Sequence, residues 1–429
     1  MNDPRGSIWR RWDLHFHTPS SYDYKDKSVT NDDIINVLKY NGIEVVAITD
    51  HHLIDVARIS QLKALAKDDI SILPGIELRT ELGGSESVHM VGIFAEDADL
   101  DSIWEKLRVQ LDIMPKAVKD KGDDAVYVDL KDSAKVIHDL GGIVSIHAGR
   151  KTNSIESIKN NHKSKMKLKQ DVALSSVDIF EVTQLDDVTE YKNIVFPQIG
   201  REFPIIIGSD NHNARQYSPG TLCWLKADPT FKGLVHVLKE PMERVFLGTE
   251  PSKNLAVSSN TTKYLDQLKI WKESSGPFTE QWFDGLTLPL NQDLVAVIGN
   301  KGSGKSALLD VIGLLGNTRQ HSHFSFLNTN KFKNPRQNRA QHFRARLLWK
   351  SGKLTERRLD QEPDMEDVER VKYLPQDYLE GLCNEIGAPE RSKFDEELEK
   401  VIFSHVKRED RLGKGCLLYT SPSPRDRQK

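Results

Sequence analysis

The chain has 429 residues, with 60 lysines and arginines against 63 aspartates and glutamates, so its formal net charge is −3. A near-neutral balance excludes a polycation that coats nucleic acid along its whole length and leaves room for a local basic groove. No apolar run approaches the roughly 18 residues of a membrane span. We therefore expect a folded cytoplasmic protein of about two or three domains, with no membrane partner.

The three cysteines show neither a Cys-x-x-Cys spacing nor the pattern of a disulfide framework; they are Cys223, Cys383 and Cys416. This usage fits a reducing compartment and speaks against a metal site built from thiolates.

Through about residue 250, short β-type runs alternate with helix-like stretches such as residues 31–40 and 53–66. The expected strands are residues 44–49, 70–77, 88–94, 143–146, 177–182 and 204–208. This alternation predicts βα units around a parallel sheet or barrel. We expect one large α/β domain over residues 1–250.

Histidines and carboxylates recur beside these runs. Because side chains alternate along a strand, Asp13, His15 and His17 share one face of an extended segment. The later candidates are Asp50, His51, Glu77, His89, His147, Glu181, Asp210 and His212. Each residue alone fits an ordinary polar strand position or a satisfied core histidine. Since strand ends of a βα barrel meet at one mouth, the repeated pattern predicts that these side chains converge.

Six segments resemble, in order, the motifs of the polymerase and histidinol phosphatase (PHP) domain: DLHFHT (13–18), AITDHH (47–52), GIEL (75–78), VHMVGIF (88–94), SIHAG (145–149) and GSDNH (208–212). The resemblance covers about residues 10–250. It implies a distorted (β/α)7 barrel and a cluster of two or three divalent metals that hydrolyses phosphoesters, as multinuclear sites do.

The resemblance also assigns ligands by position. One metal would be held by His15, His17, Glu77 and Asp210. Glu77 would bridge to a second metal on His89 and His147. A third would need His51, His212 and a residue of the loop after His17, where Asp23 is the best candidate and Tyr22 occupies another register. Glu181 is expected behind the ligands.

Nitrogen and oxygen ligands without thiolate suit Mn, Zn or Fe. Arg150, directly after the strand that ends at His147, is a candidate phosphate clamp and is added to the catalytic set of His15, His17, Glu77 and Asp210. A surface arginine is the alternative.

Residues 299–306 read GNKGSGKS and match the phosphate-binding loop GxxxxGK[ST] at every position. We expect a strand at 294–298 before the loop and a helix at 306–315 after it, whose N-terminus favours phosphate. Lys305 would reach the β- and γ-phosphates of ATP and Ser306 would bind Mg²⁺. The remaining loop contacts are expected at Gly299, Asn300, Gly302, Ser303 and Gly304.

The wider stretch LVAVIGNKGSGKSALLDVIGLLG resembles the first lobe of ABC-type P-loop ATPases of the SMC kind. YLPQ (373–376) resembles their Q-loop, which makes Gln376 a candidate Mg²⁺ or water contact, with an ordinary loop as the alternative. No LSGGQ-like segment, Walker B strand or switch histidine follows. The resemblance implies an incomplete ATPase lobe over residues 281–415, and the fusion resembles TrlF-type proteins, in which a PHP module precedes such an ATPase.

The remaining segments differ in composition. Residues 251–280 are rich in Ser, Asn, Thr and Lys and are expected to form a linker. Residues 344–350 and 353–359 predict a β-hairpin. From Cys416 the chain reads CLLYTSPSPRDRQK, and we interpret residues 416–429 as a non-native tail that resembles sequencing-adaptor read-through; a native disordered tail is the alternative.

Together these features favour a metal-dependent phosphoesterase that acts on nucleic acid or nucleotides and is regulated by ATP. The resemblance adds a dimer formed through the ATPase lobe and a role in DNA repair or phage defence. The alternatives are a small-molecule phosphatase of the histidinol-phosphate sort and a non-catalytic ATP-binding regulator. Basic runs at 150–169 and 331–346 are candidate nucleic-acid contacts, with solvated surface faces as the commoner explanation.

Overall fold

The computed structural model describes residues 4–81, 87–113, 126–157, 162–273, 283–364, 366–376, 378 and 380. The chain divides into two compact units, Met1–Asn260 (unit 1) and Thr261–Lys429 (unit 2). No helix in these described ranges has the length and apolar character that crossing a membrane requires. The expected tail at 416–429 lies outside the described residues.

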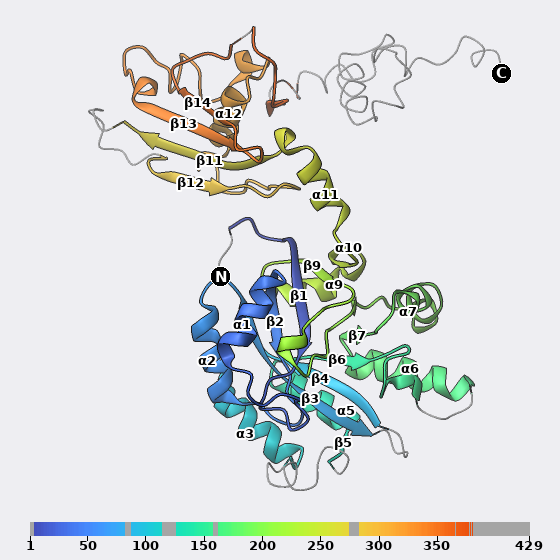
Figure 1. Cartoon of the computed structure of the whole chain (residues 1–429). Coiled ribbons are helices and arrows are strands. Elements are labelled where there is room, and N and C mark those ends of the chain that lie inside the picture. Colours follow the sequence, from blue (N-terminus) through green and yellow to red (C-terminus); the bar gives the residue numbers. More distant parts are fainter. Residues whose placement is uncertain are drawn as a thin grey trace, which may run out of the picture. The chain divides into compact units, whose positions relative to one another are not determined.

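Unit 1 is a mixed α/β structure (Figure 1). Its strands are β1 (Ile8–Phe16), β2 (Ile43–Ile48), β3 (Ser71–Glu81), β4 (Ser87–Ile93), β5 (Val128–Asp129), β6 (Ile143–His147), β7 (Ile179–Glu181), β8 (Ile205–Ile206), β9 (Cys223–Ala227) and β10 (Val245–Leu247). Its helices are α1 (Asn31–Tyr40), α2 (Val56–Ala66), α3 (Leu100–Gln110), α5 (Leu130–Asp139), α6 (His162–Ser176), α7 (Leu185–Glu190), α8 (Phe196–Ile199), α9 (Phe231–Lys239), α10 (Pro241–Arg244) and α11 (Ser252–Ser259).

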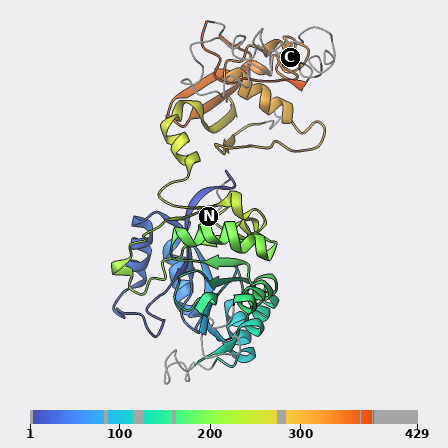
Figure 2. The ribbon, with the colours of Figure 1, turned by 90° about the vertical axis from the view of Figure 1, so that its right-hand side faces the viewer.

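The strands of unit 1 form one sheet in the order β10-β9-β1-β2-β3-β4-β6-β7-β8, with β5 beside β3. The segment after β8 returns to the end of β1, where the Asp210 amide donates to the His15 carbonyl (2.9 Å) and the His17 amide donates to the Asn211 carbonyl (3.2 Å). The sheet is therefore a nearly closed barrel, and Figure 2 shows helices flanking its strands.

The expected parallel arrangement holds for only part of the sheet. β4 runs antiparallel to both β3 and β6, whereas β1-β2-β3 and β6-β7-β8 are parallel. β3 ends at Glu81 and β4 begins at Ser87, and so short a separation cannot hold the crossover that parallel neighbours require.

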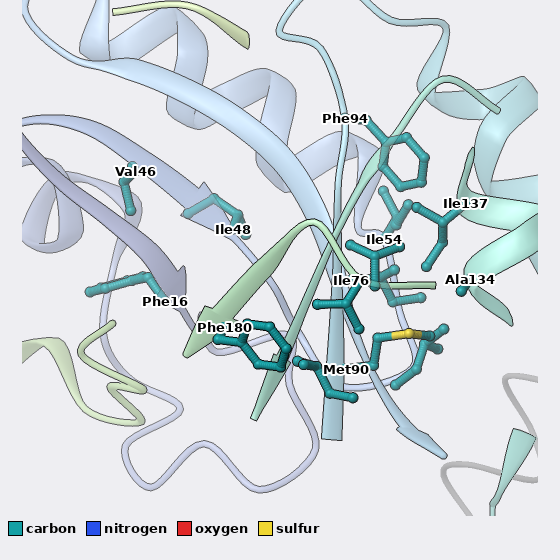
Figure 3. Packing of buried hydrophobic residues seen from close by; sticks show 14 of the residues in the cluster. Phe16, Val46, Ile48, Ile54, Ile76, Met90, Phe94, Ala134, Ile137 and Phe180 are labelled. Atoms are coloured by element: carbon teal, nitrogen blue, oxygen red, sulfur yellow. The ribbon is translucent and has the colours of Figure 1, made fainter. Parts of the chain in front are cut away.

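The strands of unit 1 are apolar on both faces because both faces are covered. On β2, Val45 and Ala47 join one buried cluster, and Val46 and Ile48 join another. Figure 3 shows the second cluster, in which Phe16, Ile48, Ile76, Met90 and Phe180 come from five different strands. This double burial fixes the register of each strand and so the direction of its polar residues.

Helix α1, which follows the loop after His17, begins at Asn31, the first residue of the stretch expected to be helical. Thr30 accepts a hydrogen bond from the amide of Asp33, and the Asp33 side chain accepts one from the Thr30 amide, so α1 starts with a capping box. Ile34, Ile35 and Leu38 form the buried face of α1.

Unit 2 contains a four-stranded antiparallel sheet in the order β12-β11-β13-β14. Its elements are β11 (Leu265–Lys272), β12 (Leu286–Pro289), α12 (Lys305–Leu315), β13 (Phe343–Trp349) and β14 (Leu354–Arg358). The predicted hairpin is present as β13 and β14. β11 lies within residues 251–280, the range expected to be a linker. It forms a strand because Leu268 and Ile270 alternate with polar residues and bury one of its faces.

Candidate metal centre

The two histidines at the end of β1 lie at the centre of a polar cluster. His15 Nε2 is 3.1 Å from His17 Nε2 and 3.0 Å from Glu77 Oε2. Asp210 Oδ1 completes the group at 3.6 Å from His15 Nε2 and 3.4 Å from His17 Nε2. The four residues each offer a ligand atom, and these atoms all lie within 4.8 Å of one another. They are the set that sequence assigned to one metal.

Glu77, in the middle of β3, is shared by several histidines. Its Oε1 is 2.6 Å from His89 Nδ1 and 3.7 Å from His147 Nε2, and its Oε2 is 3.3 Å from His51 Nδ1. Burial would raise the pKa of Glu77, but His51 and His15 hold it well below its usual range. An ionised carboxylate thus lies between the imidazoles that the resemblance assigned to neighbouring metals.

A third group lies toward the loop after β1. Asp23 Oδ2 is 3.3 Å from His51 Nε2 and 2.9 Å from His212 Nε2. His17, His51 and His212 also present nitrogens within 4.8 Å of one another. Asp23 therefore brings a carboxylate to the two histidines, and the Tyr22 ring lies beside His51 with ring centroids 5.5 Å apart.

Two groups orient ring nitrogens from behind. Both oxygens of Glu181 lie near His15 Nδ1, at 3.0 and 2.9 Å, which leaves His15 Nε2 facing the cluster. Burial would raise the pKa of Glu181, but His15 and Lys151 lower it to about 2. His147 Nδ1 lies 3.1 Å from the Thr152 carbonyl, so the Nε2 of His147 also faces inward.

Asp13 and Asp50 lie beside the candidate ligands in the sequence, but their carboxylates accept hydrogen bonds from the surrounding loops. The Tyr217 hydroxyl (2.9 Å) and the Ser209 amide (3.0 Å) donate to Asp13. The Thr18 amide (2.6 Å) and hydroxyl (2.7 Å) donate to Asp50. These carboxylates are occupied by donors and fix the loops that carry the histidines.

Backbone geometry also adapts to the cluster. A Cβ at Gly208 would lie 2.6 Å from the His15 Cβ and 2.8 Å from Glu181 Oε1, so only glycine fits there. Asp210 has a left-handed backbone with φ of 49°. Such conformations persist where the surrounding structure enforces them, and they are concentrated at functional sites.

The residues of the cluster fit a divalent metal. His147 Nε2 and His17 Nδ1 are buried and have no hydrogen-bond partner among the described residues. Burial and Lys151 lower the pKa of His147 to about 3, so its imidazole is neutral, as ligation requires. Donors of nitrogen and oxygen type in overlapping sets match a multinuclear site.

Arg150 and Lys151 do not lie where their sequence suggests: the candidate clamp Arg150 points away from the cluster, and Lys151 of the basic run is buried beside it. The Arg150 guanidinium is exposed and turns to α7, where Nη1 donates to Gln184 Oε1 (3.1 Å) and lies 3.6 Å from Asp187 Oδ1. Lys151, which sequence placed in a basic run, is buried against Asp210 and Glu181. Its neighbours in sequence give no signal of this burial.

In unit 2 the glycine loop is present and α12 begins at its lysine. Gly299, Gly302 and Gly304 have positive φ angles, and the Lys305 ammonium donates to the carbonyls of Gly299 (2.7 Å) and Asn300 (2.9 Å). Ser303 and Ser306 are exposed. The loop residues that sequence assigned to phosphate therefore form one exposed turn at a helix N-terminus.

The expected strand at 294–298 is wrong for the described structure, in which these residues adopt no strand. Leu294 and Ile298 are 84% and 89% exposed. A continuous apolar run forms a strand only where neighbours pair with it, and the described sheet ends at β12. Gln376 is exposed and donates to Glu380 Oε1 (2.8 Å), with no described contact to the loop.

Three of the six cations in the basic run at 331–346 pair with carboxylates. Lys333 Nζ is 2.8 Å from Glu362 Oε1, Arg344 pairs with Glu273, and Arg346 Nη2 is 2.6 Å from Glu356 Oε2. Paired cations on a surface have less charge to offer a phosphate backbone.

No protein-family model matches the chain, and no curated protein matches it. Among solved structures, an amidohydrolase from Chromobacterium violaceum is 17% identical over 55% of this chain and 97% of its own, with a TM-score of 0.36. A lesion-specific endonuclease from Pyrococcus furiosus is 15% identical over 64% of this chain and 65% of its own, with a TM-score of 0.42. A two-domain protein from Bacteroides vulgatus, described as containing a predicted PHP-like metal-dependent phosphoesterase, is 14% identical over 66% of this chain and 84% of its own, with a TM-score of 0.39. PHP-like metal-dependent phosphoesterases are thus among the solved structures similar to this chain.

Proposed function

We propose that unit 1 is a metal-dependent phosphoesterase of the PHP kind with a distorted (β/α)7 barrel. The observation that carries the proposal is the convergence of His15, His17, Glu77 and Asp210 within 4.8 Å, with further sets that share these residues. Burying so many ionisable groups together is costly unless cations bind among them.

The residues divide the work by position. Glu77 has oxygens toward both His51 and His89, and as a ligand it would be shared between neighbouring metals. Glu181 holds His15 Nδ1, so that Nε2 keeps its lone pair directed inward. Asp23 and His212 lie at the more exposed end, where a third position would be filled. Divalent Mn, Zn or Fe bound here would lower the pKa of a water and neutralise charge on a phosphoryl group.

The substrate that we propose is a phosphoester of nucleic acid or of a nucleotide. What supports it is the second unit of the same chain, whose loop 299–306 has the sequence of a nucleotide-binding turn and is exposed over residues 299–303, directly before α12. We propose that this loop binds ATP with Mg²⁺ and regulates unit 1 as part of a dimer, in the manner of TrlF-type proteins. A small-molecule phosphatase would have no use for such a loop.

One assay tests the proposal. The chain is loaded with Mn²⁺ or Zn²⁺ and incubated with histidinol phosphate, with nucleotides, and with single- and double-stranded DNA and RNA, with and without ATP. We expect metal-dependent cleavage of a nucleotide or nucleic acid. Release of phosphate from histidinol phosphate alone would replace the substrate class, and the absence of any hydrolysis together with the absence of bound metal would refute the enzyme.

His15→Ala provides the matched loss of a proposed ligand. His138→Ala is the control, because His138 lies on α5 and pairs with Asp178 (2.8 Å) away from the cluster. Equal rates for both variants would show that the cluster does not carry the reaction.

A further inference from the structure

Lys151 is a buried cation that contacts two carboxylates of the cluster, Asp210 and Glu181. Its side chain is 4% exposed and follows the end of β6. Its Nζ lies 2.8 Å from Asp210 Oδ2 and 3.2 Å from Glu181 Oε1. A buried ammonium is stable only when paired, and here two carboxylates from separate segments provide the pairing.

The two oxygens of Asp210 have different neighbours. Oδ2 accepts the hydrogen bond of Lys151, whereas Oδ1 faces His15 Nε2 (3.6 Å) and His17 Nε2 (3.4 Å). The Asp210 side chain is 30% exposed and stands on a left-handed backbone. A partly exposed carboxylate without a donor on its outer oxygen would have several rotamers open to it.

We infer that Lys151 is a positioning residue that holds Asp210 Oδ2 and thereby keeps Oδ1 directed at a bound metal. The inference rests on the proposed function, because it assumes a metal between Asp210 and the side chains of His15 and His17. Lys151 is too deeply buried to contact a substrate, so its effect passes through Asp210 and Glu181.

A purely electrostatic role makes the opposite prediction. A positive charge this close to a divalent metal repels it, so removing the charge alone would tighten metal binding. Removing a group that orients a ligand weakens metal binding, by about 10–100-fold in comparable cases. The sign of the change in metal affinity therefore separates the two roles.

The experiment is titration of Mn²⁺ into metal-free protein by calorimetry, with metal content per chain from mass spectrometry. We expect Lys151→Met to weaken the tightest Mn²⁺ site by about 10–100-fold, and Lys151→Arg, which keeps charge and donors, to recover part of the affinity. Lys169→Met is the matched control, since Lys169 pairs with Glu156 (2.6 Å) outside the cluster, and we expect its affinity to stay within about threefold of the parent.

Unchanged or tighter Mn²⁺ binding by Lys151→Met would overturn the inference. Circular dichroism establishes that each variant is folded. If Lys151→Met does not fold, Lys151→Leu, which likewise removes both the charge and the donor, is compared with Lys169→Leu, and tighter or unchanged binding has the same meaning. Failure of the parent chain to bind Mn²⁺ would count against the proposed function instead, so the two failures are distinguishable.

Discussion

In unit 1 the groups proposed to handle phosphate are buried and in contact, whereas in unit 2 they are exposed and held mainly by their own backbone. His15, His17 and Glu77 are at most 1% exposed. Residues 299–303 are all exposed, and within the described part of unit 2 the Lys305 ammonium donates to the carbonyls of Gly299 and Asn300. The histidine and carboxylate cluster of unit 1 is preorganised by long-range contacts, and the loop of unit 2 is organised by local ones.

This difference separates what each site must do on binding. A metal entering unit 1 meets ligand atoms already within 4.8 Å of one another. A nucleotide entering unit 2 must take the Lys305 ammonium from the carbonyls of Gly299 and Asn300. Rearrangement on binding is therefore expected in unit 2, where it would accompany the proposed regulation by ATP.

The largest effect is expected from the centre of the buried site. Glu77→Gln removes the charge that Oε1 and Oε2 share among the surrounding histidines. We expect kcat/KM of the Mn²⁺-loaded chain to fall by about a thousandfold or more, equivalent to about 4 kcal/mol of transition-state stabilisation. Glu190→Gln, at an exposed position on α7, should leave the rate unchanged. Comparable rates for the two variants would contradict the bridging position of Glu77.

The second prediction concerns the exposed loop of unit 2. Lys305→Met removes the ammonium expected at the β- and γ-phosphates, and we predict that ATP affinity falls by about 10–100-fold, as for a lost charge-assisted hydrogen bond. Lys301→Met, at a variable position of the same loop, is the control. Calorimetric titration of MgATP measures both. Nucleotide binding that is indifferent to Lys305 would remove the phosphate-loop interpretation.

The sequence located much of unit 1 because its pattern depends on local rules. α1 spans the predicted residues 31–40, and the expected strands overlap β2, β3, β4, β6, β7 and β8. His147 lies at the end of β6 as expected, whereas Glu77 lies in the middle of β3, and His89 reaches the cluster from near the start of β4 because that strand runs antiparallel. Asp23 also lies with His51 and His212, as the loop register suggested.

The burial of Lys151 could not be predicted from the sequence, because its environment is assembled from distant segments. It stands in a run of lysines that reads as a solvated face, and only the arrival of Glu181 on β7 and of Asp210 after β8 buries it. The predicted strand at residues 294–298 is absent from the described structure, and the reason again lies in contacts with distant segments. The Val and Ile content of these residues favours a strand, but pairing depends on neighbours, and none pairs with them among the described residues.

A pH experiment sharpens the contrast between preorganised and local contacts. Glu181 has a pKa near 2 in the folded chain, below its ordinary value of 4.5. Its stabilisation is therefore present above about pH 4.5 and is lost as the pH falls through about 2. We expect Glu181→Gln to lower the free energy of unfolding of the metal-free chain by on the order of 3 kcal/mol at pH 7. The difference from the parent should shrink below pH 4.5, as measured by urea unfolding at each pH, and a difference independent of pH would contradict the pairing with His15 and Lys151.

The smallest effect concerns how the exposed loop is supported from behind. Asp310, on the helix that begins at Lys305, is buried, and burial raises its pKa. Its Oδ1 accepts from the Tyr373 hydroxyl (2.6 Å) and its Oδ2 from the amides of Phe326 (2.7 Å) and Leu327 (3.1 Å). Tyr373→Phe leaves Oδ1 without this donor and should destabilise unit 2 by about 1–2 kcal/mol, visible as a lower melting temperature by calorimetry.

Tyr40→Phe is the control for that change, because Tyr40 is 90% exposed in unit 1 and its hydroxyl has no comparable burial. Since Tyr373 lies three positions before Gln376, the same variant tests whether α12 and this segment act together. A fall in stability with unchanged MgATP affinity would show that the contact anchors the helix without shaping the loop. A fall in both would show that unit 2, like unit 1, orders the groups proposed to bind phosphate through a contact distant in sequence.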